Sequence, residues 1–157
     1  MRSSQLLEVT TIAVNTLIVD DSSDTRAWLK VKLNGLGCTV VGEADNAAEG
    51  LRNFEALRPQ LVTLDLVMPD IEGVTAMDLC RRISREDPDV AILVISARPT
   101  VDSHEYLKLG AIGYLEKPFV DFAQAAKLLR SYFPELKITG ASPVKRHGLS
   151  ARLTQRS

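Results

Sequence analysis

Five side chains with reactive groups stand at the ends of short apolar segments of this chain. Asp20 and Asp21 follow LIV, Asp65 follows LVTL, Ser96 ends VAILVI, and Lys117 follows IGYLE. Crowded carboxylates repel one another unless a cation neutralises them, and hard oxygen ligands select Mg²⁺ or Mn²⁺. A carboxylate can also attack phosphorus to form an acyl phosphate, while a hydroxyl and an ammonium group can bind phosphoryl oxygens. These residue types predict a phosphoryl-transfer site that depends on a divalent cation.

The segments that carry these residues follow a regular alternation. Short β-branched runs predict five strands, at 17–20, 38–44, 61–65, 90–96 and 112–119, and each is followed by a segment of helical period. Strands that alternate with helices form right-handed crossovers and a parallel sheet. Because the strands are continuously apolar, we expect helices on both faces of the sheet. The sequence therefore predicts a doubly wound α/β domain over residues 15–133.

The predicted sheet gives the reactive residues a common location. In an open parallel sheet, ligands bind outside the carboxyl ends of the strands. Each residue alone has an ordinary explanation, since an aspartate at a strand end often caps a helix and a lysine before proline is usually solvated. Their convergence on one edge favours a shared site, with Asp65 as the central acid.

Length and composition are those of an ordinary globular chain. It has 157 residues, of which 45% are hydrophobic and 25% charged, with a formal net charge of −1. This balance provides no general attraction to nucleic acid or to a membrane. The uncharged run 9–19 is too short to span a bilayer and lacks a signal-peptide cleavage site, so we expect a cytoplasmic protein. Cys38 and Cys80 lie in apolar segments and are expected to be buried thiols.

Two flanking segments fall outside the predicted domain. Residues 1–14 form a poorly defined N-terminal extension, and residues 134–157 are expected to be a disordered basic tail. A tail of this size is too short to be a DNA-binding output domain. We therefore expect a stand-alone domain without direct DNA binding.

Four motifs resemble the response-regulator receiver domains of bacterial two-component signalling, in particular the single-domain chemotaxis type. They are LIVDDS (17–22), LVTLDLVMPDIEG (61–73), VISA (94–97) and GYLEKPF (113–119). The resemblance implies a flavodoxin-like fold, with five helices around a five-stranded parallel sheet in the order 2-1-3-4-5.

The resemblance also implies an acceptor and a metal site. Asp65 would be the phosphoacceptor. Asp20, Asp21, Asp65 and the backbone carbonyl of Val67 would bind Mg²⁺, for which Mn²⁺ could substitute. No other cofactor is implied.

A switch is implied by the same family. Ser96 would be the hydroxyl that moves toward the phosphoryl group, and Tyr114 the aromatic residue that turns inward when it does so. Lys117 would bind the phosphoryl group, and the Lys117–Pro118 peptide bond is often cis in this family.

As a function, the resemblance implies a signalling domain rather than an enzyme, although it would assist its own Mg²⁺-dependent phosphorylation and dephosphorylation. The phosphoryl group would come from a sensor histidine kinase or a histidine phosphotransfer protein. An unidentified protein target would then bind the surface of the fourth helix (101–109), the fifth strand and the last helix. A homodimer is compatible with the family, and no membrane partner is expected.

Two other functions compete with this interpretation. A receiver-like adaptor would bind its partner without phosphorylation, although such domains usually lack one of the reactive residues found here. A phosphatase with an aspartate nucleophile on a similar sheet would need a second acid where this chain has Val67. The second alternative is therefore rejected.

Overall fold

A computed structural model describes residues 13–97, 103–118, 122–134 and 136 of the chain. The N-terminal extension and basic tail predicted from the sequence lie almost entirely outside these residues. The elements, in chain order, are β1 (Val14–Val19), α2 (Ser23–Gly35), β2 (Cys38–Ala44), α3 (Ala47–Leu57), β3 (Leu61–Leu64), α4 (Ala76–Glu86), β4 (Ala91–Ser96), α5 (Ser103–Lys108), β5 (Gly113–Glu116) and α6 (Ala123–Tyr132).

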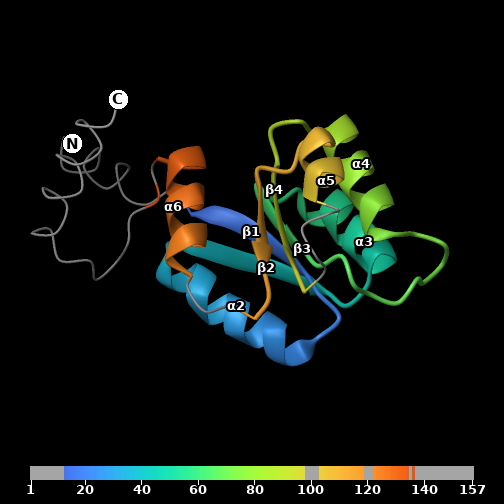
Figure 1. Ribbon diagram of the computed structural model, residues 1–157, viewed down its shortest axis with the longest axis horizontal. Helices are drawn as coiled ribbons and strands as arrows, with labels where there is room; N and C mark the ends of the chain where they lie inside the picture. Colours follow the sequence, from blue (N-terminus) through green and yellow to red (C-terminus); the bar gives the residue numbers. More distant parts are fainter. Residues whose placement is uncertain (1–12, 98–102, 119–121, 135, 137–157) are drawn as a thin grey trace, which may run out of the picture.

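The strands form one parallel sheet in the order β2-β1-β3-β4-β5, which confirms the predicted topology (Figure 1). The chain passes from β1 to β2 on one side of β1 and then crosses from β2 to β3 on the other side of β1, so the strand order reverses beside β1. The register aligns the strand ends, because Val19 pairs with Leu64 and Ser96 pairs with Glu116. A crevice at such a reversal is where open α/β sheets bind ligands.

Helices cover both faces of the sheet, as the continuously apolar strands predict. Successive residues of β1 show the arrangement, since Leu17 packs into the core under α3, α4 and α5, while Ile18 packs into the core under α2 and α6. Both side chains are fully buried, and burial of a side chain of this size contributes about 1.5–3 kcal/mol. Figure 1 shows α2 and α6 on one side of the sheet and the other three helices on the opposite side.

Three helices begin at capping residues that the local sequence supplies. Ser22, Asn46 and Thr75 each accept a hydrogen bond from the backbone N–H three residues further on. Each cap satisfies one of the free N–H groups in the first helical turn. Ser22 and Asn46 follow strands β1 and β2 closely, so these caps fix the turns at the carboxyl edge of the sheet.

The strand boundaries differ from the sequence prediction by a few residues. Strand β1 begins at Val14 rather than at residue 17, because Val14 is fully buried and pairs with Cys38 of β2. It ends at Val19, and β3 ends at Leu64, so both acids expected as last strand residues lie just beyond the strands. Tertiary pairing, rather than local apolar character, sets these limits.

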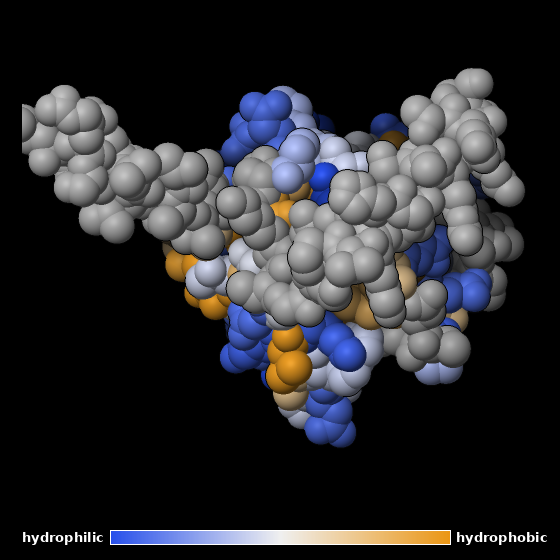
Figure 2. Space-filling model, turned by 90° about the vertical axis from the view of Figure 1, so that its left-hand side faces the viewer, coloured by the Kyte–Doolittle hydropathy of each residue, from blue (hydrophilic) through white to orange (hydrophobic). Residues whose placement is uncertain are grey.

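The described core packing continues beyond the last helix. Leu136 is buried against the core under α2 and α6, so the described packing extends three residues beyond the predicted limit of 133. Both cysteines are buried and free, as expected. On the face shown in Figure 2, the described apolar residues form small groups among hydrophilic ones. No helix among the described residues has the length and apolar character needed to cross a membrane.

Candidate functional site

Four neighbouring strands bring the reactive residues to one edge of the sheet. The backbone N–H of Asp65 donates to the carbonyl oxygen of Val19 at 2.9 Å, and that of Lys117 donates to the carbonyl oxygen of Ser96 at 2.9 Å. These bonds continue the backbone hydrogen-bonding pattern of the sheet by one residue beyond the strands. They place Asp65 beside the end of β1 and Lys117 beside the end of β4.

The three aspartates meet at this edge. One carboxylate oxygen from each of Asp20, Asp21 and Asp65 lies within 4.8 Å of the other two. Asp20 and Asp65 are 1% and 4% exposed, whereas Asp21 is exposed. Backbone N–H groups orient the two buried acids: that of Ser22 donates to Asp20 Oδ1 at 2.9 Å, and that of Val67 donates to Asp65 Oδ1 at 3.1 Å.

Lys117 supplies positive charge to the cluster. Its Nζ lies 2.6 Å from Asp20 Oδ2 and 3.4 Å from Asp65 Oδ2. The Lys117–Pro118 peptide bond is cis, as the resemblance implies. One ammonium group cannot balance three carboxylates, so negative charge remains at a site rich in hard oxygen atoms. Such a site suits a divalent cation such as Mg²⁺.

Burial raises the pKa of Asp65, and the neighbouring charge of Asp20 raises it further. The N–H of Val67, the ammonium group of Lys117 and a hydrogen bond with Ser96 act in the opposite direction and lower this pKa. The net direction is upward, which means that the ionised Asp65 is held in an unfavourable environment. A cation beside it would relieve this cost.

Ser96 and Tyr114 lie on neighbouring strands and on the same face of the sheet. Ser96 is fully buried, and it shares its face with Val94 two residues earlier. Val94 pairs with Tyr114 of β5, whose partly buried side chain packs against the core under α3, α4 and α5. Tyr114 is therefore diagonal to Ser96, one strand away. This placement is compatible with coupled motion of the two side chains.

The site also contains residues that the sequence analysis did not identify. Arg26 donates from one guanidinium nitrogen to the backbone carbonyl oxygen of Asp20 at 2.7 Å, and from Nε to Glu43 Oε1 at 3.1 Å. Trp28 lines an adjoining hollow of about 530 Å³, together with Lys117, which the sequence did predict. The sequence signal that could have indicated Arg26 and Trp28 is the capping residue Ser22, because it places the first turns of α2 beside the acids.

The fold and this acidic edge define a doubly wound α/β domain with a cluster of carboxylates at the carboxyl ends of its strands. The chain belongs to the response regulator receiver domain family, whose model matches residues 16–130.

Similar proteins include both short and longer chains. The chain is 36% identical over 104 residues to the chemotaxis protein CheY of Thermotoga maritima, covering 66% of this chain and 84% of that one. It is 41% identical over 107 residues to the transcriptional regulatory protein PrrA of Mycobacterium leprae, but spans only 43% of that protein. A solved CheX-CheY-BeF3-Mg complex from Borrelia burgdorferi is similar in structure, with a TM-score of 0.69, 26% identity, and coverage of 81% of this chain and 93% of that one.

Proposed function

We propose that this chain is a phosphoreceiver in which Asp65 accepts a phosphoryl group from a sensor histidine kinase or a histidine phosphotransfer protein. The observation that carries the proposal is the cluster of Asp20, Asp21 and Asp65 with Lys117 at 2.6 and 3.4 Å from two of them. The similar Borrelia complex contains both BeF3 and Mg, which supports this assignment.

The chemistry follows from the placement of Asp65. A carboxylate oxygen of Asp65 attacks phosphorus, the phosphorus–nitrogen bond of the donor's phosphohistidine breaks, and the imidazole leaves with that electron pair and takes up a proton. The new acyl phosphate carries a charge of about −1.5 to −2. Lys117 and the Ser96 hydroxyl would bind its oxygens.

The oxygen-rich donor set fits Mg²⁺, with Mn²⁺ as a substitute. Asp20, Asp21, Asp65 and the carbonyl of Val67 would hold the ion, which would neutralise charge that develops on the phosphoryl oxygens. The backbone at Val67 is already tied to the acid through its hydrogen bond to Asp65 Oδ1. The chain's own contribution is to hold two buried carboxylates in fixed orientations before the donor arrives.

Phosphorylation would be read through the surface formed by α5, β5 and α6. Strand β5 lies at the edge of the sheet, and Leu107 of α5 and Tyr132 of α6 are 44% and 41% exposed. Movement of Ser96 toward the phosphoryl group would leave space for Tyr114 of β5 to turn inward, which alters this surface. A protein target, or a second copy of the chain, would bind the altered surface. The similar proteins include short chains, such as CheY, and longer ones, such as PrrA. That this receiver domain works without a further output domain therefore stays a prediction.

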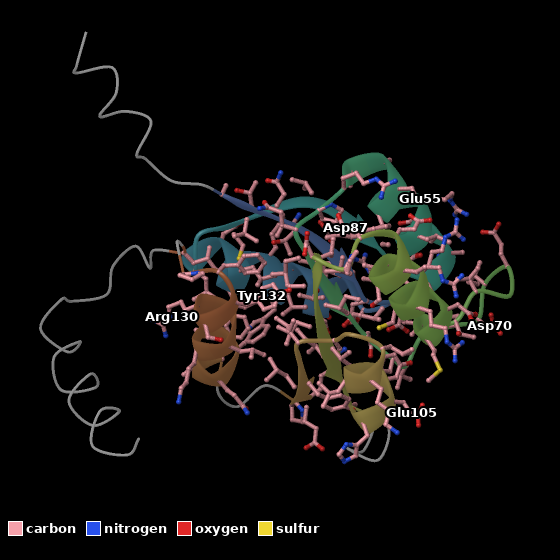
Figure 3. All side chains as sticks on the ribbon, turned by 90° about the horizontal axis from the view of Figure 1, so that it is seen from above. Glu55, Asp70, Asp87, Glu105, Arg130 and Tyr132 are labelled. Carbon is pink, nitrogen blue, oxygen red and sulfur yellow. The ribbon has the colours of Figure 1, made fainter. Side chains whose placement is uncertain are left out.

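The test is phosphorylation by acetyl phosphate, with and without Mg²⁺, resolved on a phosphate-affinity gel. We expect a Mg²⁺-dependent shift for wild type that disappears in Asp65→Asn. Asp70→Asn is the matched control, because Asp70 lies on the outer loop after β3 and should leave the shift unchanged (Figure 3). If neither acetyl phosphate nor histidine kinases shift the wild type, this proposal is wrong and the constitutive adaptor becomes the favoured alternative.

A further inference from the structure

One of the described side chains of helix α5 anchors it in the core of the domain. Among the α5 side chains that the structure describes, only Tyr106 is buried, with 6% of its surface exposed. Glu105 lies on the outer side of the helix in Figure 3, and its described neighbours His104, Leu107 and Lys108 are exposed as well. The position of this six-residue helix therefore depends strongly on what surrounds the Tyr106 ring.

The surroundings of Tyr106 include the loop that follows Asp65. Tyr106 lines a cavity of about 350 Å³ together with Leu66, Met68 and Pro69 of that loop and Met77 of α4. Tyr106 and Leu66 also belong to the same buried core, against which Met68 and Met77 pack. Methionine side chains adapt to irregular spaces, so this cavity allows the ring and the loop to change position without a clash.

The same loop is bonded directly to the proposed acceptor. The N–H of Val67 donates to Asp65 Oδ1 at 3.1 Å, and Val67 stands between Leu66 and Met68. Phosphorylation of Asp65 would add charge and bulk beside this bond. Any resulting shift of Val67 must also move its two neighbours, which form walls of the Tyr106 cavity.

We propose that Tyr106 is a positioning residue that couples the loop after Asp65 to helix α5, in parallel with Ser96 and Tyr114. This inference rests on the proposed function, because it assigns the route by which an event at Asp65 reaches α5. Coupling of this kind requires that the contacts of Tyr106 differ between the two states of Asp65. The cavity provides the space for that difference.

The test uses BeF₃⁻ with Mg²⁺, since BeF₃⁻ is described as phosphomimetic in a similar receiver domain. Fluorine NMR reports whether BeF₃⁻ is bound to the protein. Amide hydrogen exchange reports on α5 and its end, where the N–H groups of Leu109, Gly110 and Ala111 donate to the carbonyls of Glu105, Leu107 and Tyr106 at 3.0–3.1 Å. In wild type, we expect BeF₃⁻ to change these exchange rates by about fivefold or more, a typical lower limit for coupled sites.

Substitutions at Tyr106 then distinguish coupling between the Asp65 loop and α5 from a purely structural role of Tyr106 in holding α5 in place. Tyr106→Ala should still bind BeF₃⁻, but the ratio of exchange rates with and without the ligand should fall well below the wild-type ratio, because only the route through Ser96 and Tyr114 would remain. Tyr106→Phe keeps the ring and should retain the wild-type ratio. Lys108→Ala, on the exposed side of the same helix, is the matched control and should also retain it. If Tyr106→Ala does not fold, Tyr106→Leu, which keeps apolar volume without a ring, takes its place.

Each outcome decides the inference. A structural role alone would make α5 exchange faster in Tyr106→Ala but leave the ligand-dependent ratio as in wild type, and that result would overturn the inference. Binding of BeF₃⁻ to wild type without any change at α5 would also overturn it, while leaving the proposed function intact. Failure of wild type to bind BeF₃⁻ would overturn both.

Discussion

At the scale of single residues, Asp65 is ionised at a cost to the fold. Burial and the charge of Asp20 raise its pKa above the ordinary value of 3.8. A carboxyl group whose pKa is raised by folding destabilises the folded state when it is ionised. The penalty is complete above the folded pKa, decreases as pH falls through that value, and vanishes below the unfolded pKa. The ionised Asp65 thus lowers the stability of the fold at neutral pH.

Asp65→Asn should consequently stabilise the metal-free protein. Asparagine removes the buried charge and keeps a similar shape, so we expect the free energy of unfolding at pH 7 to rise by on the order of 1 kcal/mol. The gain should shrink as pH falls through the raised pKa of the wild-type Asp65 carboxyl, where this group becomes protonated. Urea unfolding of both proteins in EDTA at several pH values measures this difference. Asp70→Asn, on the exposed loop, should give no comparable gain in stability. A loss of stability in Asp65→Asn would contradict the conclusion that the ionised Asp65 destabilises the folded protein.

How far the sequence predicts the site depends on the kind of contact involved. Asp20, Asp65, Ser96 and Lys117 were predictable because each stands at a strand end, and parallel strands bring their ends to one edge. Arg26 was not, since it bonds to the backbone of Asp20 and to a side chain of β2, and neither contact leaves a local pattern. The residue roles themselves stay predictions until the phosphorylation experiments are done.

At the scale of elements, the order and type of strands and helices followed from apolar periodicity, but their limits did not. Helix α5 shows why. Its only buried described side chain is Tyr106, and a single buried position has no period to detect. Residues that line the Tyr106 cavity come from the loop after Asp65, about 40 residues earlier in the chain. Contacts of this range are set by the sheet topology as a whole.

The turn between β3 and α4 contains a residue in an unfavourable backbone conformation. Glu72 has a φ of 56°, in the left-handed region that costs most L-residues about 1–2 kcal/mol. Its side chain pairs with Arg52 at 3.0 Å, but both partners are more than half exposed, and such a pair contributes little. The conformation therefore lowers the stability of the turn.

Asparagine tolerates this conformation better than most residues, so Glu72→Asn should relieve the cost. Glu72→Ala is the matched control, because it also removes the ion pair but keeps an unfavourable backbone. We expect Glu72→Asn to be more stable than Glu72→Ala by about 1 kcal/mol in urea unfolding. Equal stability of the two variants would show that the backbone at position 72 carries no such cost.

At the scale of the whole molecule, the acidic edge links cation binding to folding. The cluster exists only when β1 and β3 are paired, so an ion that binds Asp20, Asp21 and Asp65 together binds the folded state alone. Its binding must then stabilise the entire domain, by about 2.7 kcal/mol when the free ion is 100 times its dissociation constant. The melting temperature should rise steadily with Mg²⁺ concentration.

Asp21 offers the sharpest test of this linkage, because it is the one exposed acid of the cluster and its replacement should not disturb the core. Asp21→Asn removes a ligand and a repulsive charge, so the metal-free protein should be as stable as wild type or slightly more so. The Mg²⁺ concentration needed for a given rise in melting temperature should increase at least tenfold, since even changes outside the direct ligand set have effects of about that size. Asp89→Asn, an exposed acid just before β4 at the opposite edge of the sheet, should respond to Mg²⁺ like wild type. Thermal melts in NaCl at matched ionic strength separate ion binding from screening. If all three proteins responded equally to Mg²⁺, the ion would act on the general surface charge rather than at the strand ends, and the acidic edge would lose its role as the cation site.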